Sequence, residues 1–152
     1  MAELAAIANI FSVFGLADIL FRHGKDLYDA ITKFDKASAR IPSLLVQLRG
    51  LESAIAQVLL LADQYKDSQF AQEPHQQATL ADIEALLQDC KQDFEQLDQI
   101  IQKAIDCQSS GFLLSSRFRF SRALDEQTLV RFSQSLESHK TGLLVLLGTL
   151  GG

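Results

Sequence analysis

The sequence predicts an all-α protein: an up-and-down bundle of four main helices, with a fifth short helix as an option, forming a single domain over residues 1–152. Apolar residues recur three and four positions apart over long stretches, which is the spacing of one helix face. Only two prolines and eight glycines interrupt the chain, which leaves few of the turns that a many-stranded sheet needs. A composition of 47% hydrophobic and 22% charged residues is typical of a globular domain with one core.

The first helix is expected over residues 2–36, and its first 21 residues are apolar around the whole circumference. Their only charges are Glu3 and Asp18. A helix that is apolar on every side belongs inside a bundle or in a membrane, so we expect this helix to be largely internal. A bend is allowed at Gly15 or Gly24, because glycine costs about 1 kcal/mol relative to alanine. The large apolar residues are Leu4, Ile7, Ile10, Phe11, Val13, Phe14, Leu16, Ile19, Leu20 and Phe21.

Two amphipathic helices are expected next. The first covers residues 42–65, because Pro42 suits the first position of a helix and a leucine-rich stripe follows it. The polar stretch 66–75, which contains Pro74, is predicted to be a loop or hinge. A long seam then runs through Leu80, Ile83, Leu87, Cys90, Phe94, Leu97, Ile101 and Ala104, with a mostly acidic and amide face opposite, which we expect to be solvated.

An arginine-phenylalanine segment separates this helix from the last one. Arg117, Arg119 and Arg122 alternate with Phe118 and Phe120, as in a short strand or an irregular connector. The guanidinium groups could bind acidic lipid or a partner's carboxylates. The alternative, which we favour, is a connector whose phenylalanines close the bundle end. Asp125 is the expected N-cap of the fourth helix, whose apolar face carries Leu129, Phe132, Leu136, Leu143, Leu146, Leu147 and Leu150.

Nothing in the sequence indicates catalysis, a cofactor or a metal. The three histidines, His23, His75 and His139, lie in different regions without the spacing of a metal motif. No nucleophile motif is present, so we expect no enzyme. A net charge of −5 argues against nucleic acid, whose binding requires clustered basic residues.

The cysteine pattern favours a reducing, cytoplasmic setting. Cys90 and Cys107 fall on one predicted helix, about 25 Å apart at 1.5 Å per residue, too far for a disulfide. The apolar N-terminal run lacks the basic residues that precede the apolar core of a secretory signal.

The apolar first stretch has two interpretations. Ten large apolar residues buried in a soluble core contribute about 1.5–3 kcal/mol each. Membrane insertion yields only about 0.3–0.6 kcal/mol per residue, which Asn9, Ser12 and Asp18 largely offset. A lone copy therefore prefers the bundle core, and insertion competes only if the bundle opens or several copies associate.

The order of these segments resembles the HeLo-like (SesA-related) N-terminal domain of fungal STAND receptors. The resemblance covers nearly the whole chain, and Gly-Leu-Ala-Asp at 15–18 and Leu-Glu-Ser-His-Lys at 136–140 carry most of it. The chain departs from that pattern at Phe11 and Phe14, where small residues are common, and at Phe120, where tryptophan is frequent.

The resemblance implies a helical cell-death or innate-immunity effector domain, often followed by a nucleotide-binding oligomerisation module in the same polypeptide. It implies self-association on activation and movement from the cytoplasm to the plasma membrane. There the first helix, residues 2–21, would permeabilise the lipid, with Glu3 and Asp18 as pore or switch acids. The alternative is a non-lytic adaptor bundle that mediates protein association.

Overall fold

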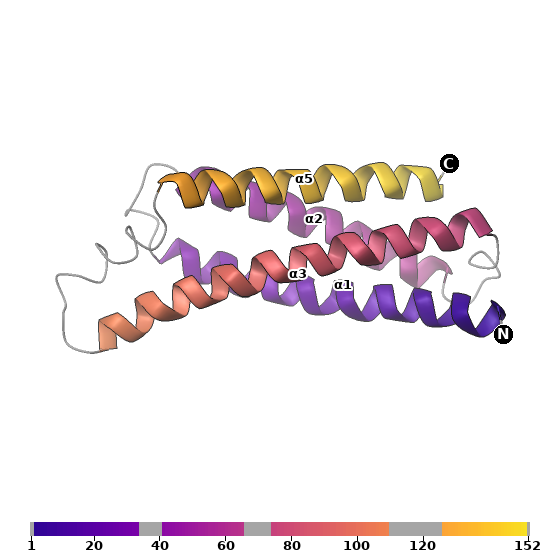
Figure 1. Ribbon diagram of the computed structural model, residues 1–152, viewed down its shortest axis with the longest axis horizontal. Coiled ribbons are helices and arrows are strands. Elements are labelled where there is room, and N and C mark those ends of the chain that lie inside the picture. Colours follow the sequence, from indigo (N-terminus) through magenta and orange to yellow (C-terminus); the bar gives the residue numbers. More distant parts are fainter. Residues whose placement is uncertain (1, 34–40, 66–73, 110–125, 152) are drawn as a thin grey trace.

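The chain forms four long helices. The computed structural model describes residues 2–33, 41–65, 74–109 and 126–151, and their side chains except those of residues 2–11, 62, 65, 104–109, 126 and 151. The helices are α1 (Ala2–Thr32), α2 (Ile41–Tyr65), α3 (Pro74–Ser109) and α5 (Glu126–Gly151) (Figure 1). This part of the chain contains no strand, and the predicted all-α bundle is confirmed. The optional fifth helix falls outside the described residues.

Each helix packs mainly against two others. The close pairs are α1 with α2, α1 with α3, α2 with α5, and α3 with α5, so α1 and α5 lie diagonally across the bundle. Successive helices alternate in direction, and both termini lie at one end (Figure 1). The neighbours α1 and α3 therefore run in parallel, as do α2 and α5. This arrangement differs from a bundle in which every neighbour is the next helix in the chain.

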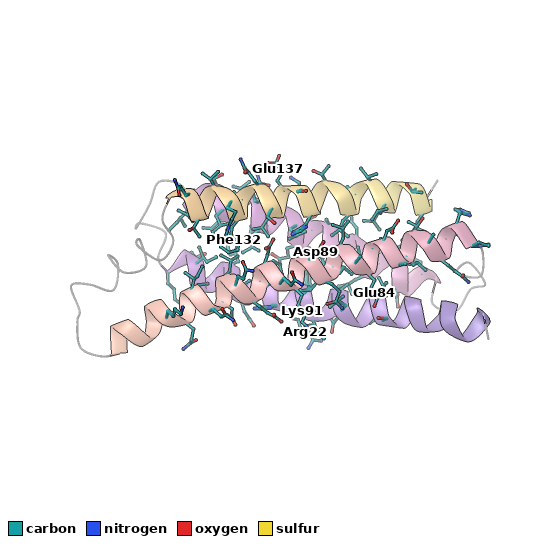
Figure 2. The ribbon with its side chains drawn as sticks, viewed as in Figure 1. Arg22, Glu84, Asp89, Lys91, Phe132 and Glu137 are labelled. Atoms are coloured by element: carbon teal, nitrogen blue, oxygen red, sulfur yellow. The ribbon has the colours of Figure 1, made fainter. Side chains whose placement is uncertain are left out.

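The core is built from one narrow stripe on each helix. Along α3 the buried residues follow spacings of four and three, as in a coiled-coil seam. The other helices repeat the pattern, and all of these side chains form one cluster. The largest fully buried side chains include Phe94 on α3 and Phe132 on α5, and the latter lies between the two helices (Figure 2).

One helix boundary corrects the predictions. Pro74 was expected in a loop, but it begins α3, since proline is accepted in the first turn, where its missing N–H has no acceptor. Helix α1 is continuous through Gly15 and Gly24. At Gly24 the helix backbone lies beside the Phe94 ring: an added Cβ would stand 3.5 Å from Phe94 Cε2, an ordinary van der Waals contact.

The expectation that the first helix is largely internal needs correction. Helix α1 occupies one corner, and its buried stripe over the described side chains contains Val13, Ala17, Leu20, Leu27 and Ile31. Its outward side carries Phe14, which is 38% exposed, and Ile19, which is 60% exposed. Four helices around one core leave every helix an outward side, so apolar residues there remain uncovered.

Candidate functional site

The predicted membrane-active residues do not share one surface. Among the six whose side chains are described, Val13 and Leu20 are buried, Leu16 and Phe21 pack partly against the core, and Phe14 and Ile19 are exposed. The other predicted residues lie outside the described side chains: Glu3, Leu4, Ile7, Ile10 and Phe11 in α1, and Arg117, Arg119 and Arg122 in the segment before α5.

Asp18, a predicted switch acid, lies at the surface of α1. Its carboxylate Oδ2 is 3.4 Å from Nη2 of Arg22, one turn along the helix, and the Arg22 side chain is 77% exposed. Figure 2 shows Arg22 pointing away from the bundle. A surface pair of this kind contributes little to stability, because water screens both charges. Asp18 is thus accessible in the closed bundle.

A polar cluster that the sequence did not reveal links α3 to α5. Asp93 Oδ2 lies 2.8 Å from His139 Nε2, and it accepts a hydrogen bond of 2.5 Å from the Ser135 hydroxyl. The Ser135 oxygen lies 3.2 Å from the same imidazole nitrogen. The side chains of His139 and Asp93 are only 12% and 17% exposed. His139 falls between the buried Leu136 and Leu143, so it occupies a seam position that elsewhere holds an apolar residue.

The cluster holds Asp93 as a carboxylate. Burial alone raises the pKa of this carboxyl, but the hydrogen bonds from His139 and Ser135 outweigh it. The positive charges of His139 and Arg131 act in the same direction, so the pKa of Asp93 falls below its ordinary value. The cluster is therefore a charge-assisted contact that joins two helices.

The arrangement is not that of a serine nucleophile. In a Ser-His-Asp triad the serine and the carboxylate bind opposite nitrogens of the imidazole, so that the histidine takes the serine's proton. Here Ser135 and Asp93 both approach Nε2, and the hydroxyl donates to the carboxylate. Among the described residues there is also no group of three or more side chains placed to hold a metal ion.

A looser contact of the same type links α3 to α1. His23 Nε2 lies 3.8 Å from Asp98 Oδ2, and the Asp98 side chain is 65% exposed. The His23 ring meets Phe94 edge to face, with 5.5 Å between centroids. Helix α3 thus offers a carboxylate to a histidine on each of its two neighbours, and only the contact with α5 is buried.

Cys90 lies on the α3 seam and is fully buried. Burial, followed by the charges of Asp93 and Asp89, raises the pKa of its thiol to about 12. Because the thiolate is the reactive form, this cysteine acts as a small apolar core residue.

Two small grooves lie between helices of the described residues. One of about 220 Å³ lies between α2 and α5, and another of about 180 Å³ lies between α1 and α2. Both are smaller than the 300–1,000 Å³ or so of most small-molecule sites. The first is lined by Ser43, Gln47, Leu129, Val130, Ser133, Gln134 and Glu137.

Helix α2, rather than α1, contains the described segment with the length and composition to cross a membrane, Ile41–Leu61. Core helices of soluble proteins meet the same criterion, and α2 contributes a full stripe to this core.

No protein-family model, curated protein or solved structure matches the chain at a significant level. The resemblance to HeLo-like domains therefore stays a prediction.

Proposed function

We propose that this chain is a signalling domain that acts by associating with other proteins, and first of all with copies of itself. The observation that carries the proposal is a set of large apolar side chains outside an already complete core. Isolated residues of this kind are common, but here they fall in stretches of α1, α2 and α5 that contain few charges. The side chains are Phe14, Ile19, Leu60, Leu144 and Val145; Val46, which is also exposed, lies three positions before Arg49 and is not counted with them.

The polar groups of the described chain support association more than chemistry on a small molecule. The buried cluster of Asp93, Ser135 and His139 uses its hydrogen bonds within the α3–α5 contact. The two grooves described above hold only about 220 and 180 Å³. The outward helix faces of the described residues offer a broader surface for recognition by another protein.

Permeabilisation of a membrane by α1 is the second candidate. Exposed Phe14 and Ile19, in a stretch with two acids and no basic residue up to Phe21, favour it, as does the resemblance to HeLo-like effector domains. An attached nucleotide-binding module and movement from the cytoplasm to the plasma membrane belong to this candidate.

The energy of removing α1 decides the order of the two candidates. Exposing the buried Val13 and Leu20 of the segment 2–21 costs about 3–6 kcal/mol at about 1.5–3 kcal/mol each. A whole domain is typically stable by only about 5–15 kcal/mol. Release of this segment would therefore consume a large share of the stability of the bundle, whereas association of closed bundles needs no such step.

Sedimentation of the purified chain and dye leakage from phosphatidylcholine/phosphatidylserine vesicles separate the candidates. Association predicts a mass that rises from micromolar to millimolar concentration, with vesicles left intact. Membrane attack predicts leakage that Ile19→Lys reduces and the matched control Val46→Lys leaves unchanged, since both positions are well exposed, at 60% and 67%. A wild-type chain that stays monomeric and leaves vesicles intact contradicts both.

A further inference from the structure

Helices α2 and α5 lie side by side. Ser43 and Gln47 line a groove with residues 129–137, and Lys140 Cδ would stand 3.0 Å from a Cβ added at Gly50. These contacts advance together along both helices, so α2 and α5 are parallel neighbours (Figure 1). Continuing this register places residues 53–61 of α2 alongside residues 143–151 of α5.

This pair of half-helices carries no charged residue. No Asp, Glu, Lys or Arg occurs between Glu52 and Asp63 on α2, or after Lys140 on α5. We call their outward side the uncharged face; its exposed residues are Ser53, Gln57, Leu60, Thr141, Leu144, Val145, Gly148 and Thr149.

The uncharged face presents apolar side chains among small polar ones. Leu60 is 65% exposed, Val145 62% and Leu144 42%. The Thr149 hydroxyl donates a hydrogen bond to the Val145 carbonyl oxygen at 3.1 Å. Burial of this hydroxyl in an interface would therefore leave its hydrogen bond intact. A Cβ added at Gly148 would meet nothing within 4 Å, which leaves room for a close approach. Depletion of charge with exposed apolar residues is typical of the centre of a protein interface.

Charge elsewhere on the chain indicates which partner fits. The net charge is −5, and α3 exposes Asp82, Asp89, Glu95 and Asp98. Two identical acidic copies repel one another over most of their surface, and least where neither carries charge. A membrane-binding helix usually relies on basic residues for attraction to anionic lipid, and the uncharged face has none.

We propose that the uncharged face is the surface through which two copies of this chain associate, with the same patch used on both. The inference rests on the proposed function; it names a second copy of the chain as the partner and the uncharged face as the contact surface. Two half-helices of about nine residues, each about 14 Å long and about 10 Å wide, offer about 280 Å² per copy, or about 560 Å² in total. A stable interface buries about 1,200–2,000 Å². The contact is therefore weak and forms when copies are concentrated.

Sedimentation equilibrium of Leu60→Lys and Val145→Lys tests the proposal. Val46→Lys is the matched control, because Val46 is 67% exposed on α2 but lies outside the uncharged face. Thermal unfolding first checks that all three variants keep the wild-type fold. We expect the dissociation constant to rise about tenfold or more at positions 60 and 145, because like charges then face each other across the contact. It should change less than about twofold at position 46.

A charge-swap mixture adds a positive readout. The double variant with Lys at positions 60 and 145 should stay monomeric, and so should the double variant with Glu at both, whereas an equimolar mixture should associate. Self-association that none of these changes affects overturns the uncharged face and leaves the proposed function intact. A wild-type chain that is monomeric at every concentration overturns both. Wild-type binding to phosphatidylcholine/phosphatidylserine vesicles that Val145→Lys abolishes would make the face a membrane surface and overturn the dimer.

Discussion

Replacing His139 by alanine should destabilise the bundle far more than an ordinary surface change does. The imidazole supplies a 2.8 Å contact to Asp93, and both side chains are more than four-fifths buried. Without it the carboxylate keeps only the hydrogen bond from Ser135. Leaving a buried carboxylate short of one hydrogen-bond partner costs about 2–3 kcal/mol.

Urea unfolding at neutral pH, followed by circular dichroism, measures this loss directly. For a chain of this size it corresponds to a fall in Tm of about 5–10 °C. Asp93→Asn, which keeps the shape but removes the charge, should cost less than His139→Ala. In the double variant the two losses of stability should not add, because each substitution removes the same contact between Asp93 and His139.

The same contact has a pH signature. The pKa of Asp93 in the folded chain lies below its ordinary value of 3.8. Its stabilising contribution is thus complete above about pH 4 and is lost as the pH falls through the lowered pKa. Wild-type stability should decrease more steeply than that of Asp93→Asn in this acid range.

Asp98→Asn is the internal control for the cluster. Asp98 also faces a histidine from α3, but at 3.8 Å and with 65% of its side chain exposed, so we expect a loss below about 0.5 kcal/mol. If His139→Ala and Asp98→Asn changed stability by the same small amount, the buried cluster would not hold α3 to α5 and the reasoning would be refuted.

Two further predictions concern packing. In a Cys107→Ser background, Cys90 should react with a thiol reagent only when the chain unfolds, because it is fully buried and its thiol pKa is about 12; rapid labelling of the native chain would contradict this. Gly148→Ala should raise the free energy of unfolding by about 0.5–1 kcal/mol, since an added Cβ meets nothing. Gly142→Ala should lose that gain, because its Cβ would lie 2.9 Å from Leu86 Cδ1; urea unfolding of both variants gives the comparison, and equal gains would show that Leu86 moves aside freely.

The helices were predictable because each has a stripe of apolar residues with a period of about 3.5, and such a period can be read from the local sequence alone. The predicted seam of α3 from Leu80 to Ile101 is buried at every position. The start of α3 was misjudged because Pro74 lies in a polar stretch, and the same residue that ends one helix can begin another.

The neighbours of each helix were not predictable in the same way. Periodicity tells which residues of a helix face a core, but not that α3, rather than α5, is the second neighbour of α1. The polar cluster was not predicted for the same reason: His139 has no acidic partner nearby in the sequence, since Asp93 is 46 residues away. The available signal was a histidine at a seam position of α5 together with an acid beside the buried Phe94.

The fold accounts for only part of the apolar sequence. A narrow stripe on each helix is enough to build the core, and α1 meets that need with Val13, Leu20 and the residues that follow them on the stripe. Ile19 on α1, Leu60 on α2 and Val145 on α5 contribute to no such stripe and remain about 60% exposed or more. Exposed polar residues at these positions would leave the core unchanged. Because these apolar side chains add nothing to the closed bundle, they are the most informative places to substitute, and a charge at each separates association from packing without disturbing the fold.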